Sequence, residues 1–245
     1  MESSNLSLES TEDTLRVFSR GAEGYYSQGE YIRKYLGRNS VPGLCFGLSV
    51  MWIKSHIEEK ELTPVRGFSP WFLERSMLRF FRSTASRSFK NKRIGAESLL
   101  RTELGITIAR NIQLSYFRAF DRIESRLPQS PEVHRDFAYR RAASVAGIMV
   151  PPSVKIAYDV TRLRDQLAGK SGHLLLSLGS QTVSHAVAFY YRTDGVRRRV
   201  RLFDPNLGEF SFGFGDMDRF FAALHAYYHI GGGVLFDKIR IYRCT

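Results

Sequence analysis

Cysteine is scarce in this chain of 245 residues, which contains only Cys45 and Cys244. The two lie at distant points of the sequence, so they do not form the disulfide framework of a small secreted domain, and we expect a reducing compartment. No Cys and His spacing typical of a zinc site is present. No apolar run approaches the ~20 residues that a membrane helix requires. The sequence therefore predicts no metal or other cofactor and no membrane span.

Acidic residues are outnumbered, with 24 Asp and Glu against 36 Lys and Arg and a formal net charge of +12. Thirteen basic and five acidic residues fall between positions 65 and 126. Such a surplus favours an anionic partner, for example an acidic membrane surface or an acidic protein. Neither a glycine-rich phosphate loop nor an RNA-binding motif accompanies it, so no nucleic-acid partner is expected.

Residues 1–14 are polar and poor in apolar side chains, which predicts a disordered tail without a Sec-type signal. Glu2 stands where N-myristoylation requires glycine. The remaining residues, 15–245, contain no internal repeat and no linker-like stretch. With 43% hydrophobic residues in the whole chain, we expect them to form one domain with a single lobe boundary near residue 150.

The hydrophobic period changes at that boundary. Before it, apolar residues recur at helical spacing, and after it, short apolar runs are separated by turn residues. The expected helices are 13–36 with breaks at Gly21 and Gly24, 46–61, one opening at Ser69, 96–120 with a break at Gly105, 130–149, 161–168 and 216–228. The expected strands are 172–179, 184–192, 197–203, 209–214 and 234–242. This predicts an α+β fold, with a helical lobe (15–150) packed on an antiparallel sheet lobe (151–245).

Cys45 follows Pro42 and Gly43 and opens the helix predicted for 46–61. Unpaired backbone N–H groups and the positive end of the helix dipole meet at a helix N-terminus, and both stabilise a thiolate. This position favours a nucleophile. The alternative is that Cys45 is a small buried hydrophobic residue, as most isolated cysteines are.

Two residues far downstream could complete a nucleophilic system with Cys45. His185 lies near the start of a predicted strand, and Asp204 ends the strand that follows. A thiol, an imidazole and a carboxylate in this order are typical of a Cys-His-Asp arrangement. His185 could instead be a core histidine, and Asp204 could merely open a turn. Asp194 is the competing carboxylate, although Asp-Gly at 194–195 is a strong hairpin signal.

Three segments together resemble a known family. They are Gly43-Leu44-Cys45 with its helix, His185-Ala186-Val187-Ala188, and Phe203-Asp204-Pro205-Asn206-Leu207-Gly208-Glu209-Phe210. The set resembles the YopT/AvrPphB family of cysteine proteases, which are bacterial effectors, over roughly residues 40–242. The third segment is the most specific of the three. The resemblance implies a papain-like fold.

The resemblance also implies a role for each matched residue. Cys45 would attack a peptide carbonyl to form an acyl-enzyme, His185 would take and return the proton, and Asp204 would orient the imidazole. The Cys45 backbone N–H would donate to the oxyanion. Asn39, six residues upstream, would add a side-chain amide at the spacing that papain-like enzymes use.

As an effector of this family, the chain would be delivered by type III secretion, with residues 1–14 as a candidate secretion signal. It would act as a monomer in the host cytoplasm or at a host membrane, on a signalling protein such as a small GTPase or a protein kinase. Its positive charge argues against a polybasic GTPase tail as the recognised surface. Two alternatives stay open, a thiol-dependent deamidase or transglutaminase with the same three residues and a basic adaptor without enzymatic activity.

Overall fold

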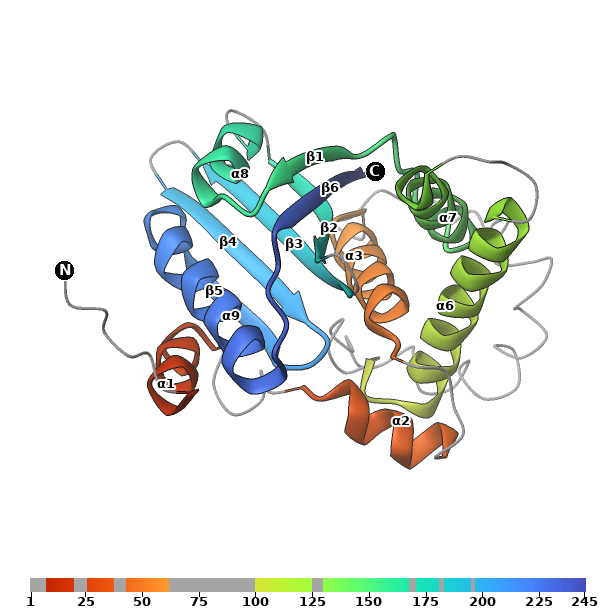
Figure 1. The fold of residues 1–245 in the computed structure, drawn as a ribbon, viewed down its shortest axis with the longest axis horizontal. Helices are drawn as coiled ribbons and strands as arrows, with labels where there is room; N and C mark the ends of the chain where they lie inside the picture. Colours follow the sequence, from red (N-terminus) through yellow and green to blue (C-terminus); the bar gives the residue numbers. More distant parts are fainter. Residues whose placement is uncertain are drawn as a thin grey trace.

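The computed structural model describes residues 8–19, 26–37, 43–61, 100–124, 130–167, 171–180, 183–194 and 197–245. In these residues an antiparallel sheet carries helices on both faces (Figure 1). The helices are α1 (Leu8–Phe18), α2 (Gln28–Leu36), α3 (Cys45–Glu61), α6 (Glu103–Glu124), α7 (Pro131–Val145), α8 (Val160–Leu167) and α9 (Met217–Gly232). The strands are β1 (Val154–Ala157), β2 (Gly172–Gly179), β3 (Ser184–Asp194), β4 (Arg197–Asp204), β5 (Gly208–Gly213) and β6 (Lys238–Cys244). The strand order is β1-β6-β2-β3-β4-β5.

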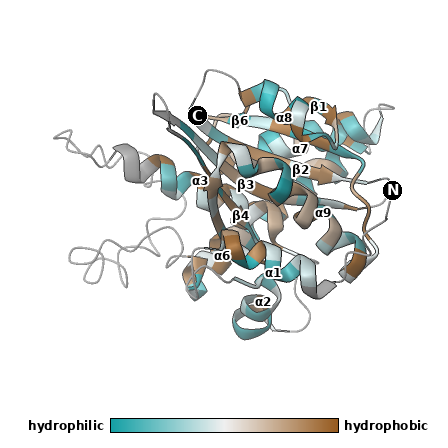
Figure 2. Ribbon diagram, turned by 90° about the vertical axis from the view of Figure 1, so that its left-hand side faces the viewer, coloured by the Kyte–Doolittle hydropathy of each residue, from teal (hydrophilic) through white to brown (hydrophobic). Residues whose placement is uncertain are grey.

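The central strands are buried on both faces, which explains their nearly continuous apolar sequences. In β2, Leu174 and Leu176 pack in the hydrophobic cluster that includes α8 and α9, whereas Leu175 between them packs in the cluster that includes α3. Successive side chains of a strand point to opposite faces, so a strand covered on both sides needs apolar residues at every position. Figure 2 shows these strands largely brown between the helical layers, while α2 is largely teal.

Each face of the sheet has its own hydrophobic cluster. One joins α3, α6 and α7 to the sheet, and the other joins α1, α8 and α9 to the opposite face. Helix α1, from the amino-terminal half of the chain, packs against α9 from the carboxyl-terminal half. Residues of both predicted lobes therefore contribute to each of the two clusters.

Helix α3 lies between the sheet and α6 and is buried on nearly all sides over its first nine residues. Gly47 makes this possible, because a Cβ atom there would lie 2.0 Å from the carbonyl oxygen of Ala109 in α6. On its sheet side, the Ser49 hydroxyl donates a hydrogen bond to the carbonyl of Ala186 in β3 at 3.0 Å. The nucleophile candidate thus opens a helix that is held from two sides.

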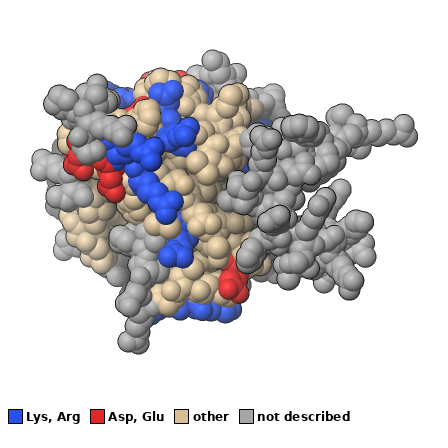
Figure 3. Space-filling model, turned by 90° about the vertical axis from the view of Figure 1, so that its right-hand side faces the viewer, with Lys and Arg blue, Asp and Glu red and all other residues tan. Residues whose placement is uncertain are grey.

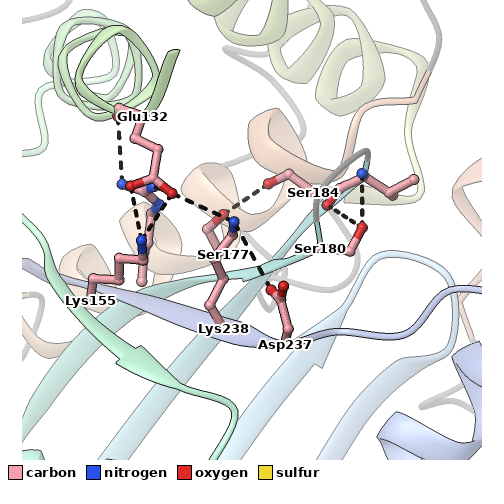
Figure 4. A network of polar contacts seen from close by, with 9 residues as sticks. Glu132, Lys155, Ser177, Ser180, Ser184, Asp237 and Lys238 are labelled. Atoms are coloured by element: carbon pink, nitrogen blue, oxygen red, sulfur yellow. Dashed lines mark hydrogen bonds and ion pairs between the residues drawn. The ribbon is translucent and has the colours of Figure 1, made fainter. Parts of the chain in front are cut away.

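A polar network ties α7 to the edge of the sheet (Figure 4). Glu132, in the first turn of α7, forms ion pairs with Lys155 of β1 at 2.9 Å, Arg240 of β6 at 3.0 Å and Lys238 of β6 at 3.5 Å. The hydrogen bond from Lys155 and the surrounding cations lower the pKa of Glu132 to about 2. The carboxylate therefore stays charged at neutral pH and its oxygens are committed to these three cations.

Most predicted elements are present, and the differences have local physical causes. Residues 8–14 are helical in α1 rather than part of a disordered tail, because Leu15 and Phe18 pack on the sheet cluster and order the turns before them. Gly105 does not break a helix, since Thr102 caps its N–H and α6 continues to Glu124. Strand β1 is an additional strand at the sheet edge, paired only with β6.

The remaining expectations concern the last strand, the basic region with the helix from Ser69, and membrane helices. The last strand begins at Lys238, later than expected, because α9 extends to Gly232. The helix expected from Ser69 and most of the basic region 65–126 lie outside the described residues. None of the helices that are described is long and apolar enough to cross a membrane.

Gly47→Ala should destabilise the protein by about 2 kcal/mol or more, because the added methyl group meets the backbone of α6 and neither helix can move without disturbing the core. The matched control is Gly29→Ala in α2, where the nearest atom would lie 3.9 Å away and stability should stay equal or rise by up to about 1 kcal/mol. Chemical denaturation measures both. Equal stability of the two variants would contradict this account of α3.

Candidate active site

Cys45 is the first residue of α3 and is half-buried. Gly43, two residues before it, has a φ of 77°, a left-handed conformation that glycine adopts without strain. The turn brings the Leu44 N–H to the side-chain oxygen of Gln28 at 2.7 Å. Because Cys45 opens the helix, its own N–H has no intrahelical acceptor. The expectation of a cysteine at a helix N-terminus is met.

His185 and Asp204 lie on neighbouring strands at the same end of the sheet. His185 is the second residue of β3 and Asp204 is the last of β4, and the imidazole Nε2 lies 3.1 Å from the Asp204 Oδ2. Asp204 is fully buried. Its other oxygen accepts the Asn206 backbone N–H at 2.8 Å, which fixes the carboxylate within its own turn. This geometry orients the imidazole ring.

Cys45 and His185 are hydrogen-bonded to each other, although they lie 140 positions apart in the sequence. Since Nε2 faces Asp204, Nδ1 is the ring nitrogen left for the thiol. Burial opposes charge on both groups, but contacts with the surrounding groups outweigh it for each. The three side chains predicted from the sequence thus meet in one place.

The electrostatics of the site favour an ion pair between thiolate and imidazolium. Burial alone would raise the pKa of Cys45, yet the hydrogen bond and charge of His185 and the backbone N–H groups of two neighbours lower it. Burial would lower the pKa of His185, but the charge of Asp204, its hydrogen bond and the contact with Cys45 raise it to about 10. Between the two pKa values, the proton resides on the imidazole and the sulfur is nucleophilic.

Tyr228 of α9 is a member of the site that sequence reasoning missed. Its hydroxyl lies 3.0 Å from each oxygen of Asp204 and 2.9 Å from the Nε2 of His185. Burial and the charge of Asp204 raise the pKa of Tyr228 well above its ordinary value, so the hydroxyl keeps its proton and donates it to the carboxylate. No sequence signal separates this tyrosine from the other aromatic residues of α9.

A chain of amide contacts links this cluster to the loop before Cys45. Asn206 donates its side-chain amide to the Tyr228 hydroxyl at 3.0 Å and accepts from the Gln28 amide at 2.5 Å. The oxygen of that same Gln28 amide accepts the Leu44 N–H. Gln28, like Tyr228, was not a sequence candidate. The contacts run from the carboxylate, through α9 and the start of α2, back to the nucleophile.

The two remaining sequence candidates, Asn39 and Asp194, are not part of the described cluster. Asn39, expected in the oxyanion hole, lies outside the described residues. Asp194 is the last residue of β3, at the opposite end of that strand from His185. Glu209 is buried, pairs with Arg201 and accepts the indole N–H of Trp52 at 3.4 Å, so it braces α3 rather than the imidazole. In the described part of the chain, no three His, Cys, Asp or Glu side chains gather as a metal site would require.

Cys45 should react with iodoacetamide at pH 6 about 100-fold faster than Cys244, whose pKa burial raises to about 12. Peptide mapping of the alkylated protein over a pH series measures the two rates. His185→Ala should remove most of the preference at pH 6, because the thiolate loses its cationic partner. Equal labelling of both cysteines in the native protein would speak against an activated thiol.

Tyr228→Phe should shift the upper inflection of the Cys45 alkylation profile to higher pH. Without the hydroxyl, Asp204 loses a hydrogen-bond donor and holds the imidazolium proton more strongly. We expect the alkylation rate at neutral pH to fall about three- to tenfold as the ring loses a positioning contact. Tyr227→Phe, which removes the neighbouring hydroxyl of α9, is the matched control, and identical profiles for both variants would disprove this role of Tyr228.

Comparisons with known proteins agree with this fold. Residues 155–239 match the family model Peptidase_C58, described as Yersinia/Haemophilus virulence surface antigen. The range contains His185 and Asp204 and begins after Cys45. No curated protein matches the sequence. The fold is similar to the crystal structure of Pseudomonas avirulence protein AvrPphB, with a TM-score of 0.53 and 18% identity over 83% of this chain and 92% of that chain. The expected resemblance to the YopT/AvrPphB type and the papain-like α+β fold are confirmed.

Proposed function

We propose that this chain, a cysteine protease of the YopT/AvrPphB type, is an endopeptidase that uses Cys45, His185 and Asp204 as its catalytic triad. The observation that carries the proposal is the contact of the Cys45 thiol with His185, whose far nitrogen is held by a buried carboxylate. In this setting the thiol is deprotonated and its sulfur is positioned by the imidazole. Neither is true of an ordinary buried cysteine.

In the proposed reaction, the Cys45 thiolate attacks the carbonyl carbon of the scissile peptide bond. The imidazolium of His185 then gives its proton to the leaving amine, and an acyl-enzyme remains. Water, deprotonated by His185, attacks the thioester and releases the new carboxyl terminus. Asp204 keeps the imidazole in one orientation and stabilises its charged form throughout.

The tetrahedral intermediate carries a negative oxygen that needs hydrogen-bond donors. The Cys45 N–H at the start of α3 is one donor, since helix geometry leaves it without an intrahelical acceptor. We propose Asn39 as the second donor. Asn39 precedes the nucleophile by six positions in the sequence.

We propose further that the protease is a bacterial effector that enters host cells by type III secretion and cleaves a host signalling protein, such as a small GTPase or a protein kinase. Two findings support this: the matching family is described as a virulence antigen, and the structurally similar AvrPphB is an avirulence protein. The basic surplus of the chain suits an acidic protein or an acidic membrane surface in the host.

The test compares the N-termini of host-cell proteins after treatment with the native protein and with triad variants. Cys45→Ala and His185→Ala should each lower cleavage at least about a thousandfold, and Asp204→Ala should lower it strongly, because each removes part of one mechanism. Thermal melting confirms that the variants fold. Near-normal cleavage by Cys45→Ala would reject the mechanism, and a one-dalton gain without new N-termini would indicate a deamidase.

A further inference from the structure

An aromatic wall stands beside the nucleophile. The ring of Phe46, the residue after Cys45, lies 5.5 Å from the ring of Tyr116 in α6 and 4.6 Å from the ring of Tyr139 in α7. The two tyrosine rings are 5.0 Å apart. The Tyr139 hydroxyl lies 3.4 Å from the hydroxyl of Ser184, the residue before His185. The wall therefore reaches from the nucleophile to the strand of the general base.

Arg135 is a charged residue on the inner side of α7, next to this wall. Ala138 and Tyr139 lie three and four residues after it, which places all three on one face of the helix, and both are buried. Arg135 itself is half-buried. Its guanidinium is hydrogen-bonded to the Tyr116 hydroxyl, and its charge acts on the Tyr139 hydroxyl as well. A cation thus lies next to the aromatic wall that flanks the nucleophile.

No carboxylate of the described residues forms an ion pair with Arg135. Glu132, three residues earlier on α7, is the natural partner by helical spacing, but its oxygens are held by Lys155, Lys238 and Arg240 (Figure 4). Asp136, the next residue, instead accepts the backbone and side-chain hydrogen bonds of Ser153. A partly desolvated cation of this kind gains from an anion supplied by a ligand.

The surrounding surface favours the approach of an acidic ligand. Figure 3 shows basic side chains in a band across the face where α6 and α7 lie. The exposed arginines of these two helices are Arg110, Arg118, Arg122, Arg140 and Arg141. A positive field of this extent raises the rate of encounter with negatively charged partners. Arg135 differs from the five because it is half-buried beside the two tyrosines of the aromatic wall.

We propose that Arg135 binds a carboxylate side chain of the protein substrate close to the scissile bond, so that the protease selects an aspartate or glutamate there. The inference rests on the proposed function and names a chemical feature of the substrate that the protease recognises. The planar guanidinium forms paired hydrogen bonds with a carboxylate, and the Tyr116 hydroxyl holds it in place.

The experiment digests host-cell protein into peptides, exposes them to the native protein and sequences the new termini. We expect an acidic residue at one fixed position near the cut. A matched peptide pair with Asp or Asn at that position then gives kcat/KM, and the Asp peptide should be cleaved about 10- to 100-fold better. Arg135→Gln should reduce this ratio to near one, and Arg135→Lys should retain part of it.

Arg141→Gln is the matched control, because it removes the same charge from an exposed position of the same helix and should leave the Asp preference unchanged. Arg135→Glu should invert the preference toward a peptide with Lys at the position. Cleavage without an acidic preference, or the same preference in Arg135→Gln and the native protein, would overturn the inference. Failure of the native protein to cut any peptide would overturn the proposed function and this inference with it.

Discussion

The burial of α3 between the sheet and α6 is the constraint on which the rest of the structure depends. A helix covered on nearly all sides cannot shift without opening the core, so the position of its first residue is fixed by packing. The backbones of α3 and α6 approach closely at Gly47, and Ser49 anchors the other side of the helix to β3. Through these contacts Cys45 is held beside His185, which starts that same strand.

The electrostatics of the site follow from that position. A thiolate, an imidazolium and a carboxylate are each costly to bury alone, and each is stabilised here by the next. The hydroxyl of Tyr228 and the backbone N–H of Asn206 complete the surroundings of Asp204. Gln28 then joins this group to the turn before the nucleophile. The site is therefore one polar network with members from the sheet, α9, α2 and the start of α3.

Much of the fold could be predicted from local patterns. Strand β2 has the predicted bounds, and β3 ends and β4 begins on either side of the predicted hairpin connection. Strand β1 could not be predicted, because an edge strand with one neighbour and mostly exposed side chains has no apolar pattern. The burial of α3 on nearly all sides could not be predicted either, since periodicity does not reveal a second helix packed on the other side.

The sequence by itself determined which residues are candidates for the chemistry, because residue types, their order and their local context belong to the chain. A cysteine after a turn, a histidine opening a strand and an aspartate closing the next could all be identified in this way. Only the tertiary structure decided which further residues join them. Tyr228 and Gln28 lie on other helices than Cys45, and their spacing in the sequence carries no signal. Their importance arises from packing in three dimensions, where hydrogen-bond distance and burial act without regard to position along the chain.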